Sequence, residues 1–249
     1  MKNARAGHPD VANFPPPITP VRLRELENAF ERACLAASDT GAGTLYYVGR
    51  FDQLEFAIVL EPEEPLMSAR RAFFAGMNAV AEVISVDSPP EKPITFRFPG
   101  SILFDGGLVG GGQLSWPDGA QEDKIPDWLV FGATLRVGGF QELGFRMSAE
   151  STSLEEEGFG EVDPASFAAS FARHLMVEFD EWSEKGFKGI GARYLSRLSR
   201  KDSDGIRGID GNCDLLIHPA PGGGAIRTAF LPLVSTPEWL DPLTGEPKA

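Results

Sequence analysis

The chain has 249 residues, and its 36 acidic side chains outnumber its 23 lysines and arginines, which gives a net charge of −13 at pH 7. A surface field of this sign repels phosphate groups, so it disfavours binding to nucleic acid and docking on anionic lipid. The hydrophobic share of 42% and the charged share of 24% are ordinary for a globular chain with a buried core.

Targeting signals are not evident in the sequence. No stretch approaches the roughly 18 consecutive apolar residues of a membrane helix, and residues 1–11 lack the apolar run of a signal peptide. The two cysteines, Cys34 and Cys213, are too few for a disulfide framework and too isolated for a zinc site. We therefore expect a cytoplasmic protein that does not bind membranes.

The N-terminal part begins with a polar tail, residues 1–18. Thr19 and Pro20 then have the pattern of a helix cap followed by proline at the first helical position. Apolar residues from Leu23 to Ala37 recur at spacings of three and four, which predicts an amphipathic helix of about five turns. Composition and periodicity further predict strands over 44–48 and 54–60 and a second helix over 67–84.

The middle of the chain is rich in strand signals. Strands are expected over 94–98, 101–104, 108–116 and 128–137, with a hairpin turn at Asp105-Gly106-Gly107. Two helices followed by hairpin-linked strands predict an α+β fold, with helices packed on a mixed, largely antiparallel sheet. The polar run 148–157 is expected to be a surface loop, and helices are expected from Asp163 to about 185 and over 190–198.

The charged run Lys201–Gly205 is the best candidate for a domain boundary. It divides the chain into an N-terminal tail (1–18), a main domain (19–203) and a small C-terminal domain (204–249). Short strand signals over 205–209, 214–218 and 225–231 make the last part a small all-β barrel or meander. Four apolar residues are expected to pack it onto the main domain, and Trp239 to anchor the tail. These four are Ile226, Phe230, Leu231 and Leu233.

Residues with obvious catalytic chemistry are poorly arranged. The histidines, at 8, 174 and 218, accompany no G-x-S-x-G elbow, and each is more simply a structural or exposed residue. Cys34 lies in a predicted helix beside alanine, where a buried thiol is a small hydrophobe. The acidic runs 61–64 and 155–157 are typical of solvated surfaces, and no metal-ligand spacing is present.

A glycine run is more informative. Gly110, Gly111 and Gly112 stand at the start of a predicted strand, where glycine weakens the strand unless it serves a purpose. That purpose is either a β-bulge or the close approach of backbone to a ligand.

The residues around this run resemble the biotin and lipoate protein ligase superfamily. Residues 96–116 are similar to its K-W-P-N-D-[IL] and K-[VL]-[GA]-G-I-L segments, and residues 129–135 resemble its V-x-G-[IV]-G-[IL]-N strand. The order of predicted elements agrees as well. More specifically, the chain resembles a divergent biotin/lipoate protein ligase-like group in which a short C-terminal domain of unknown function follows the ligase-like domain.

The chain departs from the superfamily at the positions that carry its chemistry. Adenylating members have a G-R-G-R-x-G-[RW] loop between the two early strands, whereas this chain has only 49–53, with Arg50 as its one cation. Arg97 takes the place of the lysine of K-W-P-N-D, and Leu108 the place of the lysine of K-V-G-G-I. A leucine cannot stabilise charge at the α-phosphate. Neither cysteine lies where the octanoyltransferase branch places its nucleophile.

Three hypotheses follow, and no residue is assigned a catalytic role. The first is a binding module that takes a biotin-, lipoate- or octanoate-type acid, an adenylate, or a biotinyl or lipoyl carrier domain, through Arg50, Arg97 and the backbone of Gly110–Gly112. The second is an active acyl or biotinyl transferase or ligase with a rebuilt site. The third is a structural or regulatory interaction module. In simpler roles, Arg50 is a turn residue and Arg97 an exposed strand residue.

Overall fold

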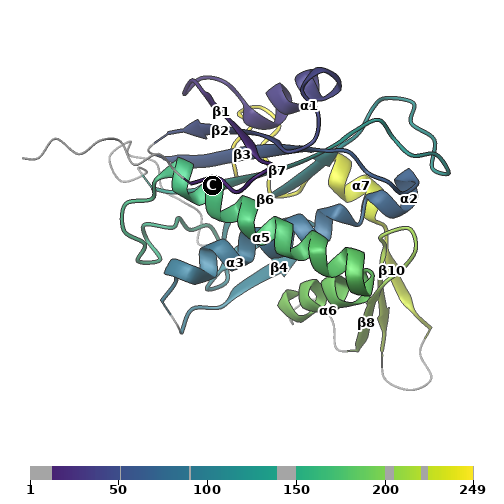
Figure 1. The fold of residues 1–249 in the computed structure, drawn as a ribbon. Coiled ribbons are helices and arrows are strands. Elements are labelled where there is room, and N and C mark those ends of the chain that lie inside the picture. Colours follow the sequence, from purple (N-terminus) through teal and green to yellow (C-terminus); the bar gives the residue numbers. More distant parts are fainter. Residues whose placement is uncertain are drawn as a thin grey trace, which may run out of the picture.

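The structure is a computed structural model that describes residues 13–50, 52–89, 91–138, 150–199, 205–219 and 224–248. It contains a seven-stranded sheet of order β1-β2-β3-β7-β6-β5-β4 and a three-stranded sheet of order β10-β9-β8. Within the large sheet, β1 and β2 are parallel and the other neighbours are antiparallel. The mixed, largely antiparallel sheet of the predicted α+β fold is confirmed (Figure 1).

The strands of the large sheet follow the predicted ones closely from β2 onward. They are β1 (Thr19–Leu23), β2 (Thr44–Gly49), β3 (Gln53–Leu60), β4 (Ile94–Arg97), β5 (Ser101–Phe104), β6 (Gly107–Ser115) and β7 (Leu129–Arg136). The predicted turn between β5 and β6 is present, since Asp105 and Gly106 both have positive φ, 48° and 88°. This backbone conformation suits the tight turn of a two-residue hairpin.

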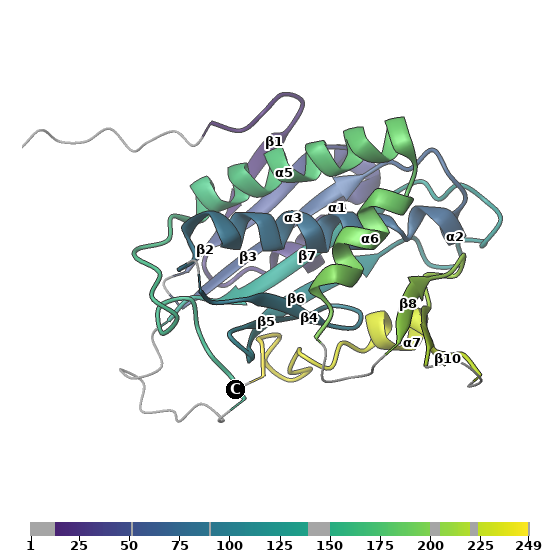
Figure 2. The ribbon, with the colours of Figure 1, turned by 90° about the horizontal axis from the view of Figure 1, so that it is seen from below.

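Helices cover both faces of this sheet. They are α1 (Ala29–Thr40), α2 (Leu66–Ala69), α3 (Ala72–Asp87), α5 (Pro164–Lys185) and α6 (Lys188–Arg197), with the short α7 (Phe230–Ser235) nearer the C-terminus. Helix α1 lies on one face, and α3 and α5 lie side by side on the other (Figures 1 and 2). Asp163 caps α5, as expected, through a hydrogen bond of 2.7 Å from the Ser166 backbone N–H.

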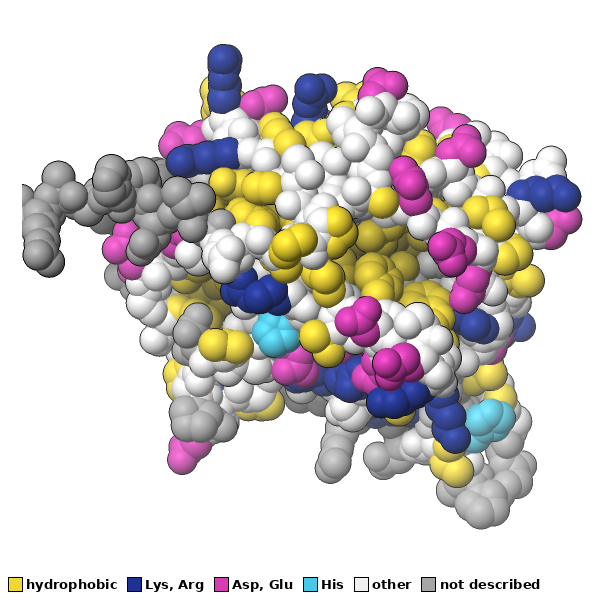
Figure 3. All heavy atoms as spheres, viewed as in Figure 1, with side chains coloured by type: hydrophobic (Ala, Val, Ile, Leu, Met, Phe, Trp, Pro, Cys, Tyr) yellow, Lys and Arg dark blue, Asp and Glu magenta, His cyan; other side chains and the backbone are white. Residues whose placement is uncertain are grey.

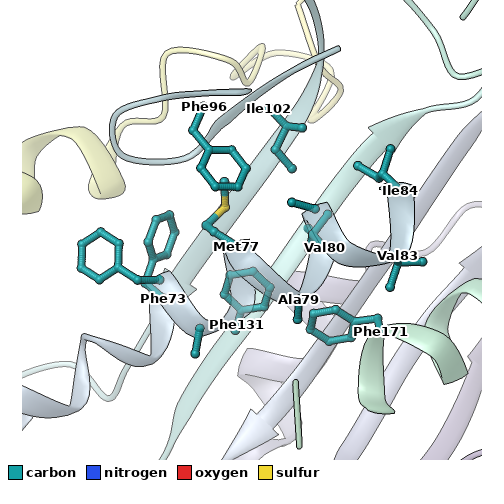
Figure 4. Packing of buried hydrophobic residues seen from close by; sticks show 14 of the residues in the cluster. Phe73, Met77, Ala79, Val80, Val83, Ile84, Phe96, Ile102, Phe131 and Phe171 are labelled. Carbon is teal, nitrogen blue, oxygen red and sulfur yellow. The ribbon is translucent and has the colours of Figure 1, made fainter. Parts of the chain in front are cut away.

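The main core lies between α3, α5 and the sheet (Figure 4). The rings of Phe131 on β7 and Phe171 on α5 stack with their centroids 5.8 Å apart. Gly76 on α3 allows this packing, because a Cβ there would stand about 2.5 Å from the Phe131 ring. The predicted apolar stripe of α5 therefore does pack into a core, with Phe167, Phe171 and Leu175 buried.

The prediction of a helix beginning at Thr19 is wrong. Residues Thr19–Leu23 form the edge strand β1, and α1 begins only at Ala29, where the Asn28 side chain accepts a hydrogen bond of 2.8 Å from the Glu31 backbone N–H. Proline is compatible with an edge strand, so Pro20 fits β1 as well as a helix start. Pairing with β2 outweighs the helical periodicity, and Leu26, counted in the predicted helix, is fully exposed.

Residues 150–157 also differ from the predicted surface loop, because Thr152, Ser153 and Leu154 are buried. Hydrogen bonds hold this segment to the sheet, between Leu108 and Thr152 and from the Leu154 N–H to the Arg136 carbonyl. The first residues of the predicted loop, 148 and 149, lie outside the described residues.

The C-terminal part contains a small meander of β8 (Ile206–Ile209), β9 (Leu215–His218) and β10 (Ile226–Thr228), as expected. It is not all β, because the end of the third predicted strand is the helix α7. Phe230 is fully buried against Phe73 and Phe74, whereas Ile226 and Leu231 are exposed. The predicted boundary at 203/204 and most of the N-terminal tail, residues 1–12, lie outside the described residues.

Candidate ligand site

Arg50 follows β2 in the short connection to β3, the position that the resemblance assigns to an anion-binding loop. Its guanidinium donates hydrogen bonds of 2.9 and 2.7 Å to the two carboxylate oxygens of Asp52. The same group donates a third bond, 2.9 Å long, to Glu246 near the C-terminus. Arg50 is therefore more than a turn residue, because it connects the β2–β3 turn to a segment almost 200 positions away in the sequence.

The ionisation of both partners reflects this pairing. The hydrogen bonds that Arg50 donates to Asp52 raise the pKa of Arg50, despite partial burial and with a further contribution from Glu246. Burial alone raises the pKa of Asp52, but the hydrogen bonds and charge of Arg50 outweigh this effect and lower it. The turn thus holds a permanent cation with two carboxylates beside it.

A second cation, Arg136, was not identified from the sequence. It ends β7 directly opposite Gln53 and is only 2% exposed. Its guanidinium donates a hydrogen bond of 2.6 Å to the Pro247 carbonyl oxygen and another of 3.5 Å to that of Thr152. Burial lowers its pKa, and the charges of Glu246 and Glu156 partly offset that effect. The one available signal in the sequence was an arginine at the end of an otherwise apolar strand.

The glycine run on β6 contains the predicted bulge. Ile102 pairs with Gly110 and Leu103 with Leu108, so Val109 is the extra residue. Gly110 has a φ of +157°, and a Cβ there would collide with the Thr134 carbonyl oxygen of β7. Gly112 faces Met77 of α3, whereas Gly111 faces the opposite side of the sheet. The bulge prediction is confirmed, and the ligand-approach prediction stays a prediction.

The side chain that lies on Gly111 is Trp239. A Cβ on Gly111 would collide with the indole ring, whose Nε1–H donates a hydrogen bond of 3.3 Å to the Gly112 carbonyl oxygen. Trp239 is 2% exposed and packs against Leu103, Leu108 and Leu240. The predicted anchoring role of Trp239 is therefore confirmed, and the surface that it covers is the glycine run.

Residues Pro237–Lys248, here called the strap, fold into a small hairpin on this face. The Lys248 N–H donates to the Trp239 carbonyl, and the Asp241 N–H donates to the Glu246 carbonyl, each over 2.8 Å. Gly245 comes within reach of Asn28, the cap of α1. The strap thus contacts Arg50, Arg136 and Gly111 together, and in Figure 2 it is the C-terminal yellow trace beside β5 and β6.

Little space remains beneath the strap. Between Pro99, Gly100 and Trp239 lies a cavity of only about 10 Å³, which is room for one water molecule at most. Leu108, in the place of the superfamily's lysine, is buried under Trp239 and Leu240. In this conformation the chain's own strap occupies the positions that the resemblance assigns to a ligand.

Arg97 does not join this group. It ends β4, at the sheet edge farthest from β1, and its side chain is exposed. It lines a separate groove of about 340 Å³ with Arg207 and Glu238, between β4 and the small C-terminal sheet. Of the predicted site residues, the structure brings Arg50, Gly111 and the Gly112 carbonyl oxygen together under the strap, and it leaves Arg97 outside.

The remaining candidates have structural environments. Burial raises the pKa of the Cys213 thiol to about 12, partly offset by Arg70 and Arg71, and burial also raises that of Cys34. Neither thiol is activated as a nucleophile. Within the described ranges, no group of three or more metal-ligating side chains occurs. No helix among those residues is both long enough and apolar enough to span a bilayer.

Several solved structures have a fold similar to that of this chain. The chain is similar to a biotin protein ligase-like protein of unknown function from Silicibacter sp. TM1040, with a TM-score of 0.74 and 24% identity over 90% of this chain and 98% of that one. It is also similar to the biotin protein ligase of Aquifex aeolicus without ligand (TM-score 0.63, 16% identity, 84% and 95% covered) and in complex with biotin and ATP (0.59, 17%, 85% and 96%). At these identities the likeness shows the fold alone.

A search of curated proteins gave no match. The family model described as the biotin/lipoate A/B protein ligase family matches residues 14–196, which include the whole seven-stranded sheet and the helices α1 to α5. This match spans well over half of the chain, and the chain belongs to the biotin/lipoate A/B protein ligase family.

Proposed function

We propose that this protein is a binding member of its family that takes a biotin- or lipoyl/octanoyl-type acid, or the carrier domain that bears one, without forming an adenylate. One observation carries the proposal: Arg50 and Arg136 together hold a carboxylate and a carbonyl of the chain's own strap. An ionised carboxylic acid offers two oxygens that can accept the same hydrogen bonds from arginine. The ligand would therefore bind by exchange with Glu246 and Pro247.

The family supports the choice of ligand class, because a relative of the same fold is described in complex with biotin and ATP. Bidentate and charge-assisted hydrogen bonds from arginine are well suited to a carboxylate. Arg136 is buried, so its attraction for an acceptor is weakly screened by water.

Adenylation is disfavoured by the side chains that are present. The reaction develops negative charge at the α-phosphate, which preorganised cations stabilise by several kcal/mol. Leu108 offers no charge at the position of the superfamily's lysine, and the turn that contains Arg50 already places Asp52 beside it. A nucleotide's phosphates would meet the Asp52 and Glu246 carboxylates that already pair with Arg50.

A thermal-shift screen with biotin, lipoate and octanoate tests the proposal. At a concentration 100 times its Kd, a ligand stabilises the folded state by about 2.7 kcal/mol. Glu246→Gln removes the competing carboxylate and keeps the shape of the strap, so it should tighten binding of the acid. The expected gain is up to about fivefold, which corresponds to the roughly 1 kcal/mol of a partly exposed ion pair. Glu238→Gln, also in the strap but without a role at Arg50, is the matched control.

Two results would overturn the proposal in favour of its alternatives. Release of pyrophosphate from ATP at ordinary ligase rates, with any of these acids, would make the protein an active ligase with a rebuilt site. The absence of a shift with every acid, in wild type and in Glu246→Gln alike, would make the strap a permanent part of a structural or regulatory module.

A further inference from the structure

A large groove lies at the opposite end of the sheet from the strap site, on the face covered by α3 and α5. Arg50 stands beside the start of β3, whereas the groove is bordered by Leu60 at its end, roughly 20 Å away at the usual rise of a strand. The groove has a volume of about 720 Å³, within the range of pockets that bind ligands. Figure 3 shows it as a hollow with a hydrophobic floor.

The floor of the groove is apolar and is assembled from three parts of the fold. Leu60 and Leu129 come from the ends of β3 and β7, and Ala69 and Ala72 come from α2 and the start of α3. Phe179 and Trp182 of α5 complete it with half-buried rings whose centroids are 6.3 Å apart. The alanines give the groove depth, and the aromatic faces remain available to a ligand.

The rim of the groove is negatively charged. Glu61, Glu63 and Glu64 follow β3 directly, in a segment that contains Pro62 and ends at Pro65. The Glu61 Oε1 atom accepts a hydrogen bond of 3.1 Å from the Ala42 N–H, which fixes that side chain, whereas Glu63 and Glu64 extend into solvent. Among the described residues that line the groove, none is lysine or arginine.

Two neighbouring arginines are engaged away from this rim. Arg70 is paired with Glu122 and lies over the Trp116 ring at 5.3 Å, and Arg71 lies over Phe187 at 5.1 Å. The charged side chains that line the groove are thus the three glutamates, within a chain whose net charge is −13.

We propose that this groove binds a segment of a partner protein in which a bulky apolar side chain is flanked by lysine or arginine. The apolar side chain would enter between Leu60, Leu129 and Phe179, where its burial contributes roughly 25 cal/mol per Å². The flanking cations would meet Glu63 and Glu64 at the rim, and the exposed face of Trp182 would add a cation–π contact. The chemistry of the groove complements such a segment in both respects, and it repels an acidic one.

Synthetic peptides of this composition test the proposal in the full-length protein. The probe is acetyl-Lys-Phe-Leu-Arg-amide, and its controls are the charge-reversed acetyl-Glu-Phe-Leu-Glu-amide and the polar acetyl-Lys-Ser-Ser-Arg-amide, each titrated by calorimetry at low salt. Only the first should bind, and its affinity should fall as salt screens the rim charges.

Two variants connect binding to the groove. Ser183→Arg introduces a cation at the groove wall on α5. The double variant Glu63→Gln with Glu64→Gln removes two rim charges. Each should lower the affinity for the probe peptide about tenfold. Ser196→Arg is the matched control on α6, because both serines are exposed and each donates its hydroxyl to a carbonyl three residues earlier. It should bind the probe as wild type does.

The proposal is wrong if the basic apolar peptide does not bind at millimolar concentration, or if the charge-reversed peptide binds equally well. It is also wrong if Ser183→Arg and Ser196→Arg bind the probe with the same affinity. None of these outcomes depends on the acids that bind under the strap, because the two sites lie at opposite ends of β3.

Discussion

Replacing Trp239 measures how firmly the strap is held on the sheet. The indole is 2% exposed, lies on Gly111, and is the largest side chain that the strap buries. Trp239→Ala removes that ring together with the hydrogen bond from Nε1 to the Gly112 carbonyl oxygen. Truncation of a buried tryptophan to alanine costs about 3–5 kcal/mol, whereas Trp239→Phe keeps most of the packing and forfeits about 1 kcal/mol for the lost donor.

The substitution should first destabilise the docking of the strap, since the strap can leave the sheet while the seven strands stay paired. Local opening of this kind appears in hydrogen exchange. Within the strap, the N–H groups of Asp241 and Lys248 are bound to carbonyls of the strap itself and should exchange when it detaches. A loss of 3 kcal/mol accelerates their exchange by more than about a hundredfold, and the phenylalanine variant should accelerate it by about fivefold.

The assay is hydrogen exchange followed by mass spectrometry on a peptide that covers residues 237–248, with Trp128→Ala as the control. Trp128 is half-buried against the α1 side of the sheet and does not contact the strap cluster. Wild-type exchange rates in the strap of Trp239→Ala would refute the view that this side chain holds the strap in place. Unprotected exchange in the wild-type strap would refute its docking altogether.

Two further predictions concern buried groups, one on the sheet and one on helix α3. Burial raises the pKa of Glu55 above its usual 4.5, although the backbone N–H groups of Ala29 and Phe30 partly offset this effect. Folding therefore favours the protonated form, and the stability that this form contributes is lost as the pH rises from 4.5 through the folded pKa. In urea melts, Glu55→Gln should become more stable relative to wild type as the pH rises over that interval. A stability difference that does not change with pH would contradict this assignment. In the same melts, Gly76→Ala should lower the free energy of unfolding by about 1–3 kcal/mol, because its Cβ would meet the Phe131 ring. Gly189→Ala is the control and should not be destabilising, because its Cβ would meet only the flexible end of the Glu181 side chain.

The sheet from β2 to β7 was predictable because its signals are local. Residues Leu54–Leu60 are β-branched, aromatic or apolar almost throughout, and Asp105-Gly106 requires the positive φ values of a hairpin turn. The start of the chain was not predictable in this way. Thr19-Pro20 is compatible with a helix start and with an edge strand, and only the parallel pairing of Val21 with Tyr46 decides between them.

The candidate site was partly predictable, for the same reason. The glycine run and Arg50 have local signatures, and both lie at the site under the strap. For Arg136 the only local signal is an arginine at the end of a mostly apolar strand, since its role depends on burial beside Thr152 and Pro247, segments that are distant in sequence. The strap itself has no hydrophobic periodicity, because one tryptophan and a few backbone hydrogen bonds hold it, and these have no repeating pattern.

The sequence suggests that the negative charge of the chain extends into the site. The structure instead places two arginines there, Arg50 and Arg136. Arg136 is buried, and a buried guanidinium is stable only where acceptors surround it. The strap provides one of these acceptors through Pro247, and it places Glu246 on Arg50 beside it. A ligand that displaces the strap must replace the Pro247 carbonyl at Arg136, because an uncompensated buried charge costs several kcal/mol, whereas the partly exposed Arg50 keeps Asp52 as its partner. If the proposed exchange occurs, the ligand needs a carbonyl or carboxylate oxygen at each position, which an amine or a hydrocarbon lacks and a carboxylic acid of the proposed class provides.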